Sequence, residues 1–187
     1  GVPAGVMKRA DAYLTDAAVE DGAKYGRHGP DDVGPTATAA ALLCRLYLGR
    51  REELSREQPK PKDNGLFWKE PTPPDSPLGR GVRYVAASRP AKDGALFELF
   101  RAMLLNRVGE EPWEKWSEPI RSRVAGAQVV KGPEKGSWFD PEDPHVSGGG
   151  RLWQTALNTM ALEAHYQHLS IYRRPRKSVP PEDFPLD

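Results

Sequence analysis

The sequence predicts an all-α protein built from about three helical hairpins that are joined by long, proline-rich loops. Apolar residues recur at three- and four-residue spacing in successive segments, which is typical of amphipathic helices. Each of these segments is followed by a glycine-bearing turn and then by a segment that is apolar almost all round. The chain of 187 residues also contains 18 glycines and 19 prolines, so turns and irregular connections must occupy much of its length.

The first predicted hairpin joins residues 6–18 to residues 36–48. Apolar side chains line one face of the first segment: Val6, Ala10, Tyr13, Leu14 and Ala17. The second segment, TATAAALLCRLYL, predicts a buried helix because it is apolar almost all round, and Gly49 suits its C-terminal end. A turn-rich stretch over 21–35 connects the two.

Residues 50–81 are predicted to form a long surface insert. They hold six prolines among many charged residues, a composition that resists helix and cannot build a core. The one apolar cluster in it, Leu66-Phe67-Trp68, is expected to pin the insert to the body of the protein.

Four further helical segments are expected after the insert. Residues 82–88 predict a short helix and residues 95–108 a strongly apolar one. Pro112 suits the start of the next helix, whose apolar stripe is formed by Trp113, Trp116, Ile120, Val124 and Ala127. Pro119 would lie inside that helix and predicts a kink or a break. The longest helix is expected over 151–172, in the interior, and residues 173–187 are expected to be an exposed tail.

The order of these segments predicts an internal repeat. The turn Gly22-Ala23-Lys24-Tyr25 precedes the helix at 36–48 much as Gly136-Ser137-Trp138 precedes the helix at 151–172. A glycine also stands just before each of these two helices, Gly34 in one and Gly150 in the other. The middle hairpin lacks the aromatic turn.

The composition excludes several classes of function. Lys and Arg number 27 against 26 Asp and Glu, so the chain has no general positive field for nucleic acid. The single cysteine, Cys44, allows neither an internal disulfide nor a multi-thiolate metal site and leaves the cellular compartment undetermined. No stretch reaches the roughly 18 to 20 apolar residues that a membrane span needs.

Several of these segments resemble the prenyltransferase and squalene-cyclase repeat superfamily, most closely bacterial proteins, notably from planctomycetes, that carry the repeats without a settled activity. The resemblance covers most of residues 1–172 and rests on GPTATAAALLCRLYLG, the W-x-x-W of Trp113 and Trp116, Gln128, Gly136-Ser137-Trp138 and GGRLWQTALNTMALEAHYQHLSIY. It implies an alpha/alpha toroid, in which inner helices line a central cavity and outer helices wrap them. Three hairpins would make a partial or open ring.

The set Gln128, Gly136 and Trp138 resembles the Q and W repeat of squalene-hopene cyclases, with a longer gap between the glutamine and the glycine. The resemblance implies a stabilising role, in which the amide ties down a helix end and the indole covers it. Gly22 and Tyr25 are the expected counterparts in the first hairpin.

The motifs that would carry chemistry in this superfamily are missing from the sequence. Squalene-hopene cyclases place an Asp-rich motif just before a Thr-Ala helix start, whereas residues 33–39 contain no acid. Cys44, His165 and Asp31 do not match the zinc pattern of prenyltransferases, and no Cys-Gly-Glu-Gln thioester motif occurs. We therefore predict no catalytic residue, no metal site and no cofactor.

The predicted function is a non-catalytic helical-repeat module that binds a partner protein or an apolar small molecule on its concave face. The candidate lining residues are aromatic: Tyr47, Phe97, Phe100, Trp153 and Tyr166. Because an open arc of apolar helices would leave this face uncovered, we expect the chain to belong to a larger protein or to pair with a second copy. The alternative is an isoprenoid cyclase-like or prenyltransferase-like enzyme whose acid or metal site lies outside this chain.

Overall fold

The computed structural model describes residues 3–48, 75–88, 94–143 and 145–164. Within these residues the fold is all-α, as predicted, and the only sheet there has two short strands. The helices are α1 (Ala4–Asp16), α2 (Pro35–Tyr47), α4 (Pro77–Ala87), α5 (Gly94–Val108), α6 (Glu110–Gly126) and α7 (Val146–Glu163).

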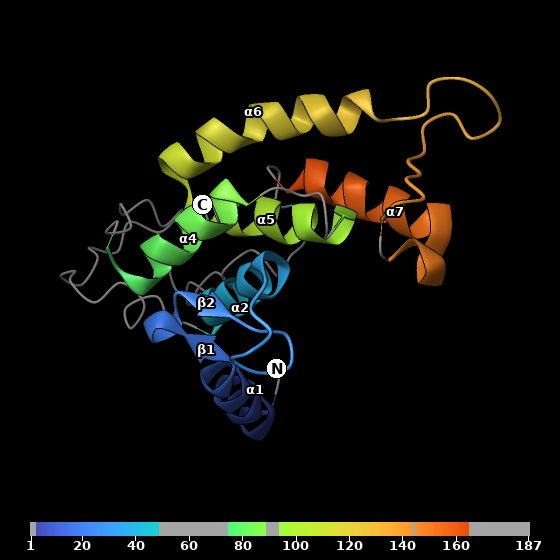
Figure 1. Cartoon of the computed structure of the whole chain (residues 1–187). Helices are drawn as coiled ribbons and strands as arrows, with labels where there is room; N and C mark the ends of the chain where they lie inside the picture. Colours follow the sequence, from blue (N-terminus) through green and yellow to red (C-terminus); the bar gives the residue numbers. More distant parts are fainter. Residues whose placement is uncertain (1–2, 49–74, 89–93, 144, 165–187) are drawn as a thin grey trace, which may run out of the picture.

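Three of the helices, α2, α5 and α7, form the centre of the fold, with α5 packed between the other two (Figure 1). The N-terminal ends of α5 and α7 meet, because Asp143, just before α7, accepts a hydrogen bond from the backbone N–H of Ala95 at 2.9 Å. The C-terminal ends of α2 and α5 meet where the Arg107 guanidinium lies 5.6 Å from the centre of the Tyr47 ring. The three central helices therefore run in the same direction.

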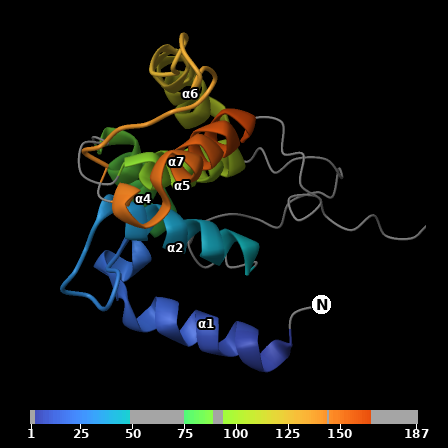
Figure 2. The same ribbon diagram turned by 90° about the vertical axis from the view of Figure 1, so that its right-hand side faces the viewer.

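The remaining helices pack around this centre. Figure 2 shows α1 below α2 and running in the opposite direction, with α6 on the far side of α5 and α7. Helix α4 packs against both α2 and α5. Helix α1 is covered at few positions: Leu14 is its one buried residue, whereas Val6, Met7 and Tyr13 are exposed. The predicted apolar face of α1 is thus only partly used.

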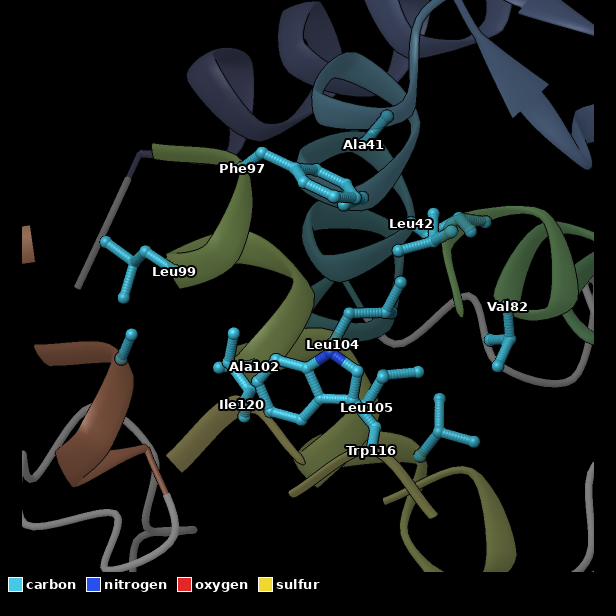
Figure 3. Packing of buried hydrophobic residues seen from close by; sticks show 14 of the residues in the cluster. Ala41, Leu42, Val82, Phe97, Leu99, Ala102, Leu104, Leu105, Trp116 and Ile120 are labelled. Carbon is cyan, nitrogen blue, oxygen red and sulfur yellow. The ribbon is translucent and has the colours of Figure 1, made fainter. Parts of the chain in front are cut away.

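The core forms around α5, which is buried on every side. Phe97 faces α2 near Ala41, Leu104 extends toward Leu42 of α2, and Leu105 and Trp116 of α6 belong to the same cluster (Figure 3). Each large side chain that is fully buried in this way contributes about 1.5–3 kcal/mol. The position of α5 follows from its sequence, because a helix that is apolar all round can bury its side chains only if other elements pack on all its sides.

A small antiparallel ribbon connects α1 to α2, where the sequence indicated only a turn. Strand β1 (Ala18–Val19) pairs with β2 (Lys24–Tyr25) through the 3-10 turn Glu20–Gly22. Gly22 has a φ of 86°, a left-handed conformation that favours glycine.

A buried arginine fastens α1 to α2. Arg45 of α2 donates hydrogen bonds to the Asp11 carboxylate at 2.5 Å and to the Thr15 hydroxyl at 2.9 Å, both in α1. Burial raises the pKa of Tyr25 in β2, and a hydrogen bond with Arg45 partly opposes this. The same guanidinium therefore joins α1 to α2 and carries its charge close to Tyr25 of β2.

One sequence-based boundary is wrong, and of the kink or break predicted at Pro119 the break is ruled out. Helix α4 begins at Pro77, inside the predicted insert 50–81, because the Ser76 hydroxyl caps it by accepting a hydrogen bond from Gly79 N–H at 3.0 Å. Helix α6 continues through Pro119 instead of breaking there, since Trp116 and Ile120 on either side are buried in the core. Residues 50–74 of the insert, including Leu66-Phe67-Trp68, lie outside the described residues.

The prediction of an interior last helix is also wrong. Helix α7 starts at Val146, has a non-helical residue at Gly150 and is described as far as Glu163. It buries one face, formed by Gln154, Leu157 and Ala161, whereas Leu152 is 81% exposed. The predicted tail 173–187 and the predicted end of this helix lie outside the described residues.

Candidate binding surface

The exposed face of α7 carries a row of apolar side chains. Leu152, Ala156 and Met160 are spaced four residues apart, so they form one ridge along the helix; Trp153 stands beside them. Leu152 is 81%, Met160 40% and Trp153 38% exposed, and Ala156 is also exposed. We call these four residues the α7 ridge. Apolar side chains grouped in this way on a surface mark an interaction site more often than scattered ones do.

Polar residues of α7 determine which face is turned inward. Gln154 is buried and forms two hydrogen bonds with the backbone of Asp140: its side-chain oxygen accepts from the N–H at 2.6 Å, and its amide nitrogen donates to the carbonyl at 2.9 Å. Thr155 bonds the backbone of Trp138. Because these contacts fix the rotation of α7 about its axis, the α7 ridge points outward.

Gly149, in the first turn of α7, leaves the space that the Trp153 side chain occupies. A Cβ on Gly149 would lie 2.3 Å from the Cβ of Trp153, so only glycine fits there. The chain then changes direction at Gly150, whose φ is 58° and ψ −152°. These two glycines allow Trp153 to pack against the start of the helix while its indole stays partly exposed.

The predicted structural motif lies in the turn between α6 and α7. The Gln128 side-chain amide donates to the Gly136 carbonyl at 2.9 Å, and the Trp138 indole N–H donates to the Val124 carbonyl near the end of α6 at 2.6 Å. Trp138 is buried and Gly136 has a φ of 90°. The three residues therefore close the end of α6, the kind of contact that a stabilising motif requires.

The turns of the first and the last hairpin are each held by a threonine in the same way. Thr155 accepts a hydrogen bond from the Trp138 backbone N–H at 3.1 Å, and its hydroxyl donates to the carbonyl of the same tryptophan at 3.4 Å. Thr38 of α2 does this with Tyr25, at 3.1 and 3.3 Å. In both places a threonine of a central helix holds both backbone groups of an aromatic residue in the turn before that helix.

The structure does not gather the predicted lining residues into one surface. Phe97 is fully buried in the core, and Phe100 is half-buried against it. Tyr47 is 41% exposed at the end of α2, and Trp153 belongs to the α7 ridge. Tyr166 lies outside the described residues. Phe97 is lost as a candidate because both sides of α5 are covered.

Sequence reasoning missed a buried charged cluster between α5 and α6. The Glu98 carboxylate, 3% exposed, accepts a hydrogen bond from Arg123 of α6 and lies 3.8 Å from Arg101 of α5. Burial raises the pKa of Glu98, and the two arginine charges oppose that rise. The sequence did contain a signal for this cluster: Glu98 is an acid inside the apolar run 95–108. Because burying an unpaired carboxylate is costly, such a residue predicts a basic partner.

Arg101 contacts two aromatic rings and the end of α4 in addition to Glu98. Its guanidinium lies 5.5 Å from the Phe97 ring and 5.6 Å from the Trp116 ring, and it donates hydrogen bonds to the carbonyls of Ala86 and Ser88 at the end of α4. Cations favour both aromatic faces and helix C-termini. The cluster therefore joins α4, α5 and α6, away from the α7 ridge.

The described part of the chain offers neither a metal site nor a membrane-spanning helix. No three or more His, Cys, Asp or Glu side chains among those residues come together as a metal site. The helices of that part of the chain include none with the length and apolarity to cross a membrane. His165, one of the residues considered for zinc, lies outside the described residues.

Comparisons with known proteins give no match: the chain matches no protein-family model, no curated protein and no solved structure.

Proposed function

We propose that this chain is a non-catalytic helical-repeat module that binds an apolar partner, as part of a larger protein or assembly. The observation that carries the proposal is the α7 ridge, in which Leu152 is 81% exposed beside Trp153 and Met160. Leaving such side chains in water gives up about 1.5–3 kcal/mol each relative to burial. A partner that covers them recovers that free energy.

The finer part of the proposal is that α1/α2, α4/α5 and α6/α7 are three hairpins of a squalene-cyclase-type repeat, arranged as an open arc. The parallel central helices and the shared Thr38–Tyr25 and Thr155–Trp138 contacts support it. In a stack of repeats each central helix packs against the next one. An uncovered ridge on the last described helix is what such a stack presents where a neighbour is missing.

The structure gives the enzyme alternative no comparable support. A cyclase or transferase of this superfamily would need an acid or a metal facing a cavity. The two buried carboxylates of the described residues, Glu98 and Asp143, instead bond Arg123 and the start of α5. We therefore keep the binding module as the proposed function.

Dye binding tests the proposal directly. At low protein concentration, 8-anilinonaphthalene-1-sulfonate should fluoresce with the wild-type chain and lose at least half of that signal with Leu152→Asp or Met160→Asp. Val130→Asp is the matched control, because Val130 is an exposed apolar residue in the loop between α6 and α7. Circular dichroism checks that all variants fold. Equal fluorescence from the wild type and the two ridge variants would refute the proposal.

A further inference from the structure

We infer that the α7 ridge binds the α7 ridge of a second copy of this chain, with the two helices antiparallel around a two-fold axis at Ala156. This inference names the partner of the proposed binding surface and so rests on the proposed function. Three observations on α7 support it: the order of side-chain sizes along the ridge, the position of its one acid, and the low charge of the exposed face.

The side-chain sizes along the ridge are compatible with a two-fold axis. Leu152 and Met160 are large and lie four residues on either side of the small Ala156. In a two-fold symmetric dimer the same patch of both copies is in contact. If residue i of one copy meets residue j of the other, residue j of the first copy therefore meets residue i of the second. Antiparallel pairing at Ala156 brings Leu152 of each copy opposite Met160 of the other, and the small central side chain lets the helices approach closely.

Charge complementarity selects the antiparallel direction. Glu163 is exposed at the C-terminal end of α7, where the carbonyl groups of its own helix disfavour an acid. It lies seven residues after Ala156, about 10 Å along the helix, and the straight part of α7 starts at Arg151, five residues before Ala156, because Gly150 is non-helical. In the antiparallel pair Glu163 therefore comes next to the start of the straight part of the other α7, where the positive end of the helix dipole favours a carboxylate.

The exposed face of α7 can also be covered at little electrostatic cost. From Leu152 to Glu163, the exposed positions of α7 are Leu152, Trp153, Ala156, Thr159, Met160 and Glu163. Glu163 is the one charged residue among them, and it lies at the rim of the contact. Because one helix ridge buries less than the roughly 800 Å² per partner of a standard interface, we expect a weak dimer that dissociates in the micromolar range.

Sedimentation velocity over a concentration series tests the dimer. The mass of the wild-type chain should rise with concentration toward twice that of the monomer, whereas Ala156→Glu, which places two acids at the axis, should remain monomeric. Val130→Glu is the control and should behave as wild type. Glu163→Lys should weaken the dimer several-fold at low salt. A wild-type chain that is monomeric up to submillimolar concentration overturns the inference.

Cysteine cross-linking tests the register. In a Cys44→Ser background with oxidised glutathione as the oxidant, Ala156→Cys should form a disulfide between two copies. Leu152→Cys alone should not, whereas an equal mixture of Leu152→Cys and Met160→Cys chains should. Efficient self-cross-linking of Leu152→Cys would indicate parallel helices and would also overturn the inference.

These outcomes separate the inference from the proposed function. A wild-type chain that stays monomeric but loses dye binding in Leu152→Asp refutes the second copy as the occupant and leaves the apolar binding surface intact. A chain whose dye binding does not depend on the ridge refutes the binding surface itself.

Discussion

Gly94 and Asp143 are in such close contact that a Cβ on Gly94 would lie 2.0 Å from a carboxylate oxygen of Asp143. That carboxylate is buried and accepts hydrogen bonds from the backbone N–H groups of Ala95 and His145, each at 2.9 Å. Gly94 also has a φ of 55°, which favours glycine. The contact fixes the start of α5 against the segment that leads into α7.

We expect Gly94→Ala to lower the free energy of unfolding by about 2–3 kcal/mol, because a left-handed alanine costs about 1–2 kcal/mol and the clash adds to it. Urea unfolding followed by circular dichroism measures the change. Gly136→Ala is the matched control: its φ is 90° but nothing lies within 4 Å of its Cβ position, so only the backbone cost of about 1–2 kcal/mol should appear. Equal losses in the two variants would show that the Asp143 contact contributes nothing.

The threonine contacts should stabilise both turns. Thr38→Val keeps the shape of the side chain but removes the hydroxyl from the buried Tyr25 backbone, which should cost about 1–3 kcal/mol. Thr155→Val should cost less, because the contact with Trp138 is only partly buried. Thr38→Ser retains the hydroxyl and should recover most of the loss in a urea titration. A Thr38→Val variant as stable as the wild type would contradict the stabilising role of the threonine contact.

Glu98 should make stability depend on pH. Burial raises its folded pKa above the ordinary value of 4.5, so the folded chain binds the proton more tightly than the unfolded chain. The stabilisation from protonated Glu98 is full below 4.5 and is lost as the pH rises through the folded pKa. Relative to Glu98→Gln, which does not titrate there, the wild type should therefore lose stability as the pH rises above 4.5.

Urea unfolding of both proteins at a series of pH values checks this expectation for Glu98. A difference that grows in favour of the wild type with rising pH would show that Arg123 and Arg101 outweigh the effect of burial.

Arg45 should hold α1 in place. Arg45→Met removes its bonds to Asp11 and Thr15, and we expect the docking of α1 to weaken by about 1–3 kcal/mol, since the pair is only partly buried. Amide hydrogen exchange in α1 should then be about tenfold faster, or more. Lys24→Ala, which removes an exposed ion pair with Glu20, is the control and should have little effect. Unchanged exchange in α1 would contradict the role of Arg45.

The central helices were the most predictable part of the fold. The expected segments 36–48 and 95–108 lie within one residue of α2 and α5, because each is a continuous apolar run that glycine or proline limits in the sequence. All-α architecture is confirmed. The short ribbon at Ala18–Tyr25 could not be expected, since two-residue strands leave no alternating pattern to detect.

The surface of α7 was beyond sequence reasoning for a different reason. Periodicity shows that a helix is apolar but not how many neighbours it has. Gln154 and Thr155 turn toward the preceding loop, so the apolar residues opposite them are the ones left outside. Trp153 was identified as a candidate, whereas Leu152 and Met160 were assigned to the interior.

The burial of α5 on every side has a consequence for how this chain unfolds. The first hairpin packs on α5 and α4, and the last hairpin packs mainly on α5, so opening either one exposes a whole side of α5 to water. Melting of one region should therefore spread to the others and give a single cooperative transition. The amides of α5 should be the slowest in the molecule to exchange with deuterated solvent.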